Sequence, residues 1–458
     1  MININQNLNS TDLLQQIDTL FSLSGEKILL IEKQYDNSKG APVFTEKGVY
    51  TSRGWTEWTQ GFQFGSALLQ FDATGNQQFL EIGRSATLRL MAPHVSHVGV
   101  HDHGFNNVST YGNLHRMMRE GKIPVNDWEK NFYELALKVS GAVQAARWTA
   151  LSEDQGYIYS FNGPQSLFAD TIRSLRALAL AHQLGHVLMG EKDRKINLLQ
   201  RLLQHAETTA QYIIYYGNKR DSYDVRGRVV HEAIFNVNDG SYRCPSTQQG
   251  YSPFSTWTRG HAWILCGYAE QLEFLYSLSK EELQPFGGKD KILSAFQAVA
   301  EAVAEFYLNN TPVDGIPYWD TGAPGLQYLG NYLDRRADPY NSHEPVDSSA
   351  AAIAAQGLVR LGNFLQKQNI EKGNTFIQAG LTVAANLFAE PYLSTNVNHQ
   401  GLLLHSVYHR PNGWDYIPPG KNIPCGESSM WGDYHVRELA LLIKRLASNE
   451  PYLRFFIS

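Results

Sequence analysis

The stretch WTRGHAWILCGYAEQL (257–272) begins with aromatic and charged residues and continues as an apolar run with helical spacing. The stretch WTQGFQFGSALLQF (58–71) shares its pattern W-T-[QR]-G-x-x-[FW], and MWGDYHVRELALLIKRL (430–446) begins in a related way. Internal self-similarity in a chain of helical patterns predicts repeated helix hairpins. We therefore expect an all-α fold in which polar and aromatic residues stand just before, or at the start of, the helices.

Helical periodicity dominates the rest of the chain as well. Segment 126–148 has a cap residue at Asn126 or Asp127 and then an apolar stripe formed by Phe132, Leu135, Ala136, Val139 and Val143. Few segments alternate with period two. The stretches VVHEAIFNV (229–237) and GLLLHSVYH (401–409) predict short strands or hairpins at loop positions.

The architecture follows from the number of helical segments and the absence of a linker. No Ser/Gly/Pro-rich stretch divides the chain, so we expect one domain over residues 1–458. About a dozen helices in hairpins fit a closed toroid of inner and outer helices, with an open helical solenoid as the alternative. In a toroid alternate helices begin at the same end, which would bring the polar and aromatic residues to one mouth.

Composition excludes several classes of protein. Apolar residues make up 43% and charged residues 18% of the 458 residues, which supplies a core and argues against global disorder. The net charge of −5, without basic blocks, argues against nucleic acid as the main partner. The three separated cysteines, Cys244, Cys266 and Cys425, indicate neither a disulfide framework nor a zinc ribbon. No apolar run is long enough to cross a membrane. The N-terminal composition predicts a cytoplasmic protein, or a periplasmic one if a leader has been removed.

A histidine-rich stretch, HVSHVGVHDHGF (94–105), places four histidines around Asp102. These residues could ligate a metal, or they could form hydrogen bonds and line a cleft. There is no helical pair of histidines four residues apart with an adjacent glutamate, and no cysteine lies nearby. The stretch therefore favours loop histidines over a metal site.

Two aspartates are candidates for acid–base chemistry. Asp102 lies in a glycine-flanked loop, and Asp170 lies in or near the first turn of an amphipathic helix, where an aspartate commonly caps the helix or complements its dipole. If both carboxylates met in one cleft, their like charges would raise one pKa and provide a general acid. The residues alone leave both interpretations open.

The segment WTRGHAW (257–263) is the densest group of candidate binding residues. An arginine between two tryptophans, Arg259 between Trp257 and Trp263, suits a planar carboxylate and a sugar face together. The alternative is a stacked structural arginine. Gly260 would allow close approach of the backbone or of a ligand.

Nine motifs in this order resemble the unsaturated glucuronyl hydrolases of glycoside hydrolase family 88: EWTQGF, HDHGF, FADTIRSL, VVHEAIF, TQQGY, STWTRGHAW, PYWD, VDSSAAAIAAQGL and MWGDYH. The resemblance covers nearly the whole chain. It implies an (α/α)6 barrel, a six-hairpin toroid with short β hairpins in its loops. It also implies removal of a 4,5-unsaturated uronic acid from the non-reducing end of oligosaccharides left by polysaccharide lyases, through hydration of the C4=C5 vinyl ether.

The resemblance also implies roles for individual residues. Asp170 matches the catalytic acid and base, and Asp102 matches a second essential carboxylate that holds ring hydroxyls. The positions that match the subsite for the unsaturated sugar are Trp58, His231, Gln249, Trp257, Arg259 and Trp263. No metal or organic cofactor is implied, and the expected partner is an unsaturated oligosaccharide.

Two features depart from the family pattern. An additional segment, 323–345, contains Arg335, Arg336 and His343 and would either reshape the leaving-sugar side of the cleft or form a decorative loop. His103 replaces a commonly apolar residue. The alternatives to the glucuronyl activity are the unsaturated rhamnogalacturonyl hydrolases, which share the barrel and part of the tryptophan–arginine motif, a sugar epimerase, and an inactive glycan-binding barrel. The His231 and Gln249 matches favour the glucuronyl branch.

Overall fold

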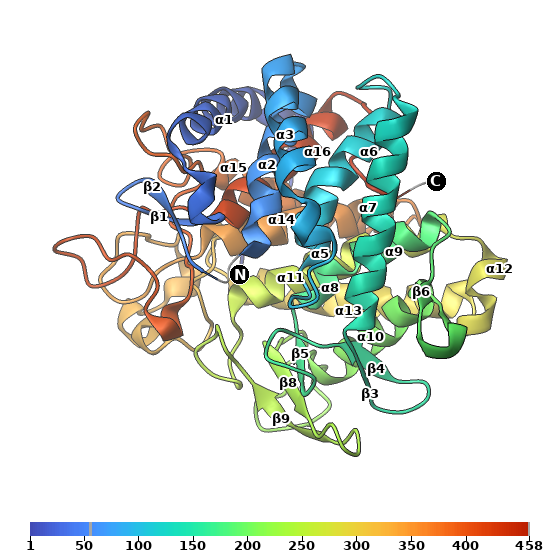
Figure 1. The fold of residues 1–458 in the computed structure, drawn as a ribbon. Coiled ribbons are helices and arrows are strands. Elements are labelled where there is room, and N and C mark those ends of the chain that lie inside the picture. The colour runs from blue at the N-terminus through green and yellow to red at the C-terminus, as the bar shows by residue number, and fades with distance from the viewer. Residues whose placement is uncertain (55–56, 457–458) are drawn as a thin grey trace.

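The computed structural model describes residues 1–54 and 57–456, and in these residues six outer helices alternate along the chain with six helical segments of an inner ring (Figure 1). The outer helices are α1 (Leu14–Gln34), α3 (Gln77–Leu90), α7 (Asp127–Ala146), α10 (Leu198–Tyr212), α13 (Lys289–Asn310) and α15 (Lys372–Leu387). The inner segments are α2 (Gln60–Thr74), α5 (His103–Asn107) with α6 (Asn113–Arg119), α8 (Thr171–Ser174) with α9 (Arg176–Gln183), α11 (Thr258–Ser277), α14 (Ser348–Gln366) and α16 (Met430–Ala447).

The inner ring is closed. Each inner segment contacts the next one, and α16 returns to pack against α2 and against the outer helix α1. This arrangement is the (α/α)6 barrel expected from the sequence, and the open solenoid is wrong. Two further short helices, α4 (Ala92–Val95) and α12 (Lys280–Leu283), lie in connections.

Short antiparallel strands occupy the connections between helices. They form the hairpins β1–β2 (Pro42–Glu46, Val49–Ser52), β3–β4 (Trp148–Ala150, Gly156–Ile158) and β6–β7 (Leu188–Met189, Lys195–Ile196), and the sheet β5–β8–β9 (Ser166–Phe168, Glu232–Phe235, Tyr242–Ser246). Figure 1 shows β3, β4 and the three-stranded sheet together at the bottom of the view. The strand expected within 229–237 is therefore confirmed as β8.

The strand expected over 401–409 is wrong. This stretch makes only isolated bridges, from Leu403 to Leu393 and from Leu404 to Ser428. His405 has a φ of 67°, a left-handed conformation that interrupts an extended run. Most apolar residues of the 401–409 stretch, namely Leu402, Leu403, Val407 and Tyr408, are buried as part of a loop instead.

Glycines allow the inner helices to approach each other closely. A Cβ added at Gly104 of α5 would lie 2.2 Å from the backbone oxygen of Ser174 in α8, and one added at Gly357 of α14 would lie 2.9 Å from the backbone nitrogen of Cys266 in α11. No larger side chain fits at either contact without moving backbone. These two glycines therefore set the spacing between neighbouring members of the ring.

A buried network of arginines and glutamates joins the inner helices. Arg173 of α8 donates one hydrogen bond to Glu270 of α11 and a 3.0 Å hydrogen bond to Glu438 of α16. Arg176 of α9 lies 3.9 Å from Glu270 and 3.7 Å from Glu438, and Arg360 of α14 lies 3.9 Å from Glu270. All five side chains are almost fully buried. Burial opposes ionisation of Glu438, but Arg173 and Arg176 lower its pKa to about 2.

The predicted apolar stripe of 126–148 faces the core only in part: Ala136 is buried and Phe132 packs against the core. The cap is Asn126, whose side chain accepts from the backbone of Trp128 and Glu129, as expected. However, Leu135 is 58% exposed, while the buried face of α7 includes Tyr133, Ser140 and Gly141. Small side chains on that face permit close packing against α9, since a Cβ at Gly141 would meet Ala181 at 2.5 Å. Close helix approach decided which face is buried.

Two further expectations concern cysteines and membranes. In the part of the chain that the structure describes, Cys244, Cys266 and Cys425 are all free, so no disulfide framework forms. None of the helices built from the described residues is both long enough and apolar enough to cross a bilayer.

We expect Glu438→Gln to lower the free energy of unfolding by about 3–5 kcal/mol, because the guanidinium groups of Arg173 and Arg176 would lose a buried countercharge. Chemical denaturation followed by circular dichroism measures this change. The control is Glu282→Gln, which removes a partly exposed partner of His182 and should cost less than about 1 kcal/mol. Equal effects of the two substitutions would contradict a central role for the network.

Candidate active site

A pocket of about 600 Å³ lies where the N-terminal ends of the inner helices meet. Among its lining residues are seven of the eight predicted from the sequence: Trp58, Asp102, Asp170, Gln249, Trp257, Arg259 and Trp263. Asp102 directly precedes α5, Asp170 precedes α8, and Trp257 precedes α11. The expectation that residues at the helix starts converge on one mouth is therefore confirmed for these positions.

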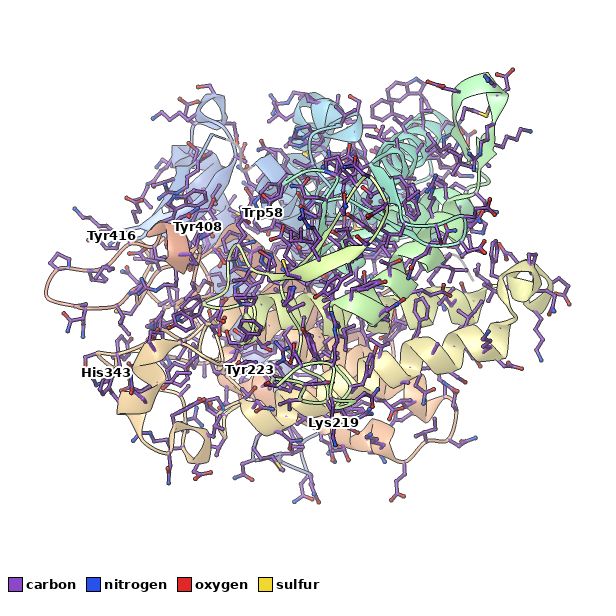
Figure 2. All side chains as sticks on the ribbon, turned by 90° about the horizontal axis from the view of Figure 1, so that it is seen from below. Trp58, Lys219, Tyr223, His343, Tyr408 and Tyr416 are labelled. Carbon is purple, nitrogen blue, oxygen red and sulfur yellow. The ribbon has the colours of Figure 1, made fainter. Side chains whose placement is uncertain are left out.

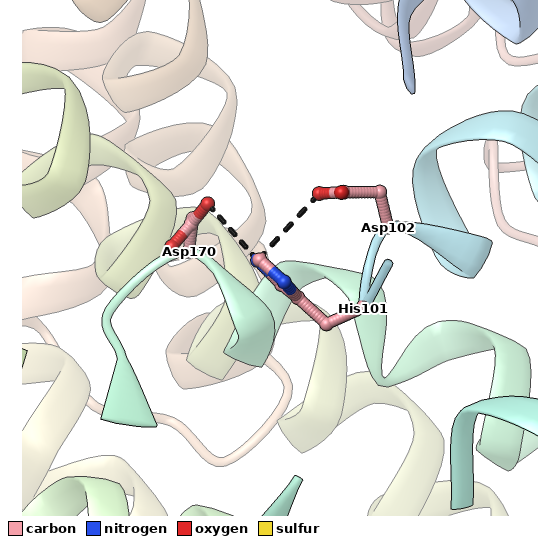
Figure 3. A group of neighbouring side chains, drawn as sticks. All are labelled: His101, Asp102 and Asp170. Atoms are coloured by element: carbon pink, nitrogen blue, oxygen red, sulfur yellow. Dashed lines mark hydrogen bonds and ion pairs between the residues drawn. The ribbon is translucent and has the colours of Figure 1, made fainter. Parts of the chain in front are cut away.

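The two aspartates lie on either side of His101 (Figure 3). The His101 Nε2 atom is 3.6 Å from Asp102 Oδ1 and 3.4 Å from Asp170 Oδ2. Neither aspartate side chain caps the helix that follows it, although both occupy the cap position. The capping interpretation of Asp170 is therefore wrong, and the two carboxylates share one buried site.

The three groups shift each other's protonation. Burial raises the pKa of Asp102 to about 6, with His101 opposing the rise and the charge of Asp170 adding to it. Burial acts in the same direction on Asp170, but the hydrogen bond and charge of His101, together with His231, hold the pKa of Asp170 below its usual value. Burial lowers the pKa of His101, yet Asp102 and Asp170 raise it overall. Of the two carboxyls, Asp102 thus holds a proton more readily at neutral pH.

Aromatic rings fix the orientation of His101. Its imidazole stacks on Phe161 with ring centroids 6.0 Å apart and meets the edge of Phe168 at 5.7 Å. Its backbone carbonyl accepts hydrogen bonds from Ser174 Oγ and Gln144 Nε2. His101 is fully buried, so its ring can turn little and Nε2 stays directed at the carboxylates.

The other buried histidines of 94–105 have structural partners. His103 contacts Ser140 Oγ through Nδ1 and the carbonyl of His97 through Nε2, both at 3.0 Å. The His94 Nδ1 atom contacts the Asn106 side chain at 3.2 Å. Burial lowers the pKa of both His94 and His103 to about 4. Both histidines are therefore neutral, and their hydrogen bonds support the start of α5.

Arg259 is held by protein acceptors on both terminal nitrogens. Its Nη1 donates to Asp347 Oδ2 at 3.1 Å and to the carbonyl of Val407, and its Nη2 donates to Gln249 Oε1 at 3.0 Å and to the carbonyl of Tyr408 at 2.8 Å. The guanidinium also lies 4.7–4.8 Å from the rings of Trp257 and Trp431. These contacts agree with the stacked structural arginine considered above, and a direct contact with a carboxylate ligand stays a prediction.

His231 lies behind the pocket wall and does not line it. Its Nδ1 atom accepts from the backbone N–H groups of Gln248 at 3.0 Å and Gln249 at 3.3 Å. Burial lowers the pKa of His231 to about 3, consistent with a neutral acceptor. His231 therefore positions the turn that carries Gln249.

The next two residues of this turn are held as well. Gly250 donates its N–H to Thr247 Oγ1, and Tyr251 donates its N–H to Asp320 Oδ2 at 2.8 Å. Asp320 comes from the PYWD motif and is fully buried. Four consecutive backbone N–H groups, 248–251, are thus satisfied by side chains, which gives Gln249 a defined position.

The tryptophans around the pocket pack against other aromatic rings in stacked and tilted arrangements. Trp58 stacks on Trp431, with ring centroids 5.1 Å apart and planes 25° from parallel. Trp263 packs against Phe105 at 4.8 Å. Gly260 makes its close approach to the indole of Trp257, which a Cβ would meet at 2.5 Å. The shared W-T-x-G pattern thereby places aromatic rings of different inner helices side by side.

Several lining residues were not predicted from the sequence: Val100, Phe105, Phe161, Gln248, Tyr408, His409 and Trp414. Tyr408 and His409 end the stretch that was predicted as a strand. Trp414 lies in a loop without periodicity, so no local pattern identifies it. Phe105 and Gln248 fall inside the quoted motifs HDHGF and TQQGY, but nothing in those motifs singled them out as lining residues.

The additional segment 323–345 does not line this pocket. Glu344 accepts hydrogen bonds from Trp319 Nε1 and from the N–H of Gly325, both at 2.7 Å, which ties the segment to the PYWD motif. His343 stacks on the exposed Tyr328 at 5.3 Å. In Figure 2, His343 lies at the periphery, away from Trp58 and Tyr408. An effect on the leaving-sugar side stays a prediction.

Three curated relatives of this chain are named as hydrolases of unsaturated sugars. No family model matches the chain. It is 26% identical over 393 residues to an unsaturated glucuronyl hydrolase of Formosa agariphila, covering 83% of this chain and 78% of that protein. It is 25% identical over 408 residues to the unsaturated glucuronyl hydrolase of Bacillus sp. strain GL1, covering 87% and 89%. An unsaturated chondroitin disaccharide hydrolase of Streptococcus agalactiae is 24% identical, covering 90% and 87%.

Solved structures share the fold. The crystal structure of the unsaturated glucuronyl hydrolase of Bacillus sp. GL1, described as responsible for the degradation of glycosaminoglycan, superposes with a TM-score of 0.71 at 21% identity, covering 95% of this chain and 97% of that one. A variant of the S. agalactiae enzyme complexed with dGlcA-GalNAc6S superposes with a TM-score of 0.62 at 19% identity, covering 93% and 90%.

The closed ring and its acidic, aromatic pocket therefore define an (α/α)6-barrel protein of the carbohydrate-active class. Within that class the chain is a relative of the unsaturated glucuronyl hydrolases over most of its length, which confirms the resemblance drawn from its motifs.

We expect Asp102→Asn to stabilise the protein at pH 8 and to leave stability near pH 4 unchanged. The folded-state pKa of about 6 lies above the ordinary 3.8, so the stability linked to this proton is present below pH about 4 and lost as pH rises through 6. The difference corresponds to at most about 3 kcal/mol. Chemical denaturation at both pH values measures it.

Asp154→Asn is the control, because Asp154 is exposed in the loop between β3 and β4. It should change stability by less than about 0.5 kcal/mol at either pH. A gain for Asp102→Asn that is equal at pH 4 and pH 8 would contradict the origin of the effect in a buried carboxylate charge.

Proposed function

We propose that the protein hydrolyses unsaturated oligosaccharides by hydrating the C4=C5 vinyl ether of a 4,5-unsaturated uronic acid at the non-reducing end. The observation that carries this proposal is the meeting of Asp102 and Asp170 in one aromatic pocket. The names of the relatives, unsaturated glucuronyl hydrolases and unsaturated chondroitin disaccharide hydrolases, support the same chemistry.

The electrostatics of the pocket suit an anionic sugar. The inner helices direct their N-termini toward it, and helix N-termini favour negative charge. Arg259 adds a buried positive charge beside Gln249. Because the Gln249 oxygen accepts from Arg259, its amide N–H groups are left to donate to a carboxylate or hydroxyl. Trp58, Trp257 and Trp263 would stack on the sugar ring.

The proposed reaction begins with proton transfer from Asp170 to C4. The C4=C5 π electrons form the new C4–H bond, and the ring oxygen shares the positive charge that develops at C5. Water then adds at C5 and gives a proton to the Asp170 carboxylate, which restores the acid. The resulting hemiketal opens and releases the neighbouring sugar. Asp102 would hold ring hydroxyls throughout.

The proton that Asp170 delivers needs a source, because in the free pocket Asp102 is the carboxyl that holds a proton more readily. The uronate carboxylate of a bound substrate adds a negative charge, which raises the pKa of both aspartates. His101 Nε2 contacts both of them, so a proton can be redistributed without passing through bulk water. We infer that substrate binding converts Asp170 into the acid.

Asp170→Asn should lower kcat at least 100-fold, because the general acid and base is lost while the side chain keeps its size. The assay follows loss of the vinyl-ether absorbance when the protein is mixed with lyase-generated disaccharides. A panel of glycosaminoglycan-, gellan- and pectin-derived products would separate the glucuronyl from the rhamnogalacturonyl activity. Glu282→Gln, far from the pocket on α12, is the matched control. Full activity of Asp170→Asn would contradict the assignment of the acid, and saturated monosaccharides as the only substrates would favour an epimerase.

The rate should also depend on pH with a defined sign. A group that must be protonated supports activity below its pKa, so kcat/KM should fall as pH rises through about 6, the value of Asp102 in the free protein. Above that pH the expected decline is about tenfold per pH unit until the next group titrates. Initial rates from pH 4.5 to 8.5 measure it. An increase of kcat/KM between pH 6 and 8 would contradict a shared proton on the aspartate pair.

A further inference from the structure

The cluster of His101, Asp102 and Asp170 combines one imidazole nitrogen with two carboxylates. One ligand atom from each lies within 4.8 Å of the other two, and all three residues are buried. Imidazole nitrogen together with carboxylate oxygen is a donor set suited to zinc and neighbouring transition metals, whereas magnesium and calcium prefer oxygen alone. The composition of the cluster therefore points to a particular class of cation.

The distances within the cluster are also compatible with ligation, because His101 Nε2 makes a long hydrogen bond to Asp170 Oδ2 and a longer contact with Asp102 Oδ1. A charge-assisted N–H···O bond is about 2.7–2.9 Å long, but the two contacts of His101 Nε2 measure 3.4 and 3.6 Å. Zinc binds imidazole and carboxylate at about 2.0–2.2 Å, so two ligands of a tetrahedral ion lie about 3.3–3.6 Å apart. Both contacts of His101 match that separation. The ligand oxygens of the remaining pair, the two aspartates, lie within 4.8 Å of each other, and binding of the ion would bring them to the same separation.

Charge and hydrogen bonding add independent support. Two carboxylates and a neutral imidazole balance a dication. Asp170 Oδ1 is buried and has no hydrogen-bond partner among the described residues, although Asp170 lines the pocket. The nearby cation, Arg147, donates its hydrogen bonds to the carbonyls of Val98, Tyr159 and Ser160 and forms no ion pair with Asp102 among the described residues. The cluster thus retains an unused carboxylate acceptor on a residue that lines the pocket.

The imidazole is also a rigid ligand, because Phe161 and Phe168 hold its ring on two sides. His231 cannot complete the set, since its Nδ1 already accepts from the backbone of Gln248 and Gln249. A fourth ligand would therefore come from the pocket itself, as water or a sugar hydroxyl, which is the open position typical of exchangeable zinc sites.

We propose that His101, Asp102 and Asp170 bind a transition-metal dication of the zinc type, and that this cation competes with the oligosaccharide for the pocket. The cation would occupy the side chains assigned above to catalysis and would therefore inhibit. Metal binding itself does not depend on the proposed hydrolase activity, so the two proposals can fail separately.

Cobalt(II) is the probe, because its visible absorption is intense in four-coordinate sites and weak in water. Titration of the Cys244→Ser protein, which lacks the exposed free thiol, should give one equivalent of four-coordinate cobalt that zinc displaces. Asp102→Asn and Asp170→Asn in the same background should each weaken binding at least tenfold. His343→Asn, in the peripheral segment 323–345, is the matched control and should bind as the parent does.

Inhibition provides the second readout. Zinc at ten times its dissociation constant should raise the apparent KM about elevenfold and leave kcat unchanged. Octahedral cobalt absorption alone, or binding unaffected by both aspartate substitutions, would overturn the metal site. The Asp102→Asn protein, expected to be more stable than the parent at pH 8, keeps the test valid if Asp170→Asn fails to fold. Four-coordinate cobalt binding without hydrolysis of any lyase product would support the metal site and contradict the proposed hydrolase activity.

Discussion

The buried arginine–glutamate network at the centre of the ring is the interaction on which the rest of the structure depends. Arg173 links α8 to α11 and α16, and Arg360 brings α14 to the same glutamate, Glu270. Desolvating these charges is costly, and only their mutual contacts offset it. The charges can be satisfied together only when the four helices stand in one relative arrangement. Asp170 and Trp257, which line the pocket, precede two of these helices, α8 and α11, so the network also affects the geometry of the pocket.

The relative position of Asp102 and Asp170 follows from one helix contact. Asp102 and Asp170 are far apart in the sequence, but each immediately precedes its helix, α5 or α8. Gly104 lies directly against Ser174, donates its N–H to Ser174 Oγ and accepts from Arg176 Nε through its carbonyl. Arg176 also takes part in the central network. The packing of α5 on α8 and the charge network thus act together on the spacing of the carboxylates.

Much of this arrangement could be predicted from the sequence, and the limits have physical causes. The W-T-x-G repeats indicated helices that begin alike, and seven of the eight predicted site residues line the pocket. Helical period alone failed in part on α7, where Leu135 fits the apolar stripe but is exposed, while close packing against α9 buries Gly141. Tyr408 and Trp414 escaped prediction because they lie on loops, whose positions depend on distant partners such as Arg259.

Asp170 illustrates why local sequence cannot assign chemistry. Asp170 and Asp347 both occupy the cap position of an inner helix, and sequence reasoning treats them alike. Asp347 does cap, accepting from Ser349 and Ala350 while it also receives Arg259. Asp170 does not, because its backbone is already helical, with φ −69° and ψ −24°, whereas Asp347 has the extended conformation of an N-cap, with φ −121° and ψ 93°. The same residue type at equivalent positions therefore caps one helix and leaves its carboxylate free of the helix start in another, and the backbone conformation decides which.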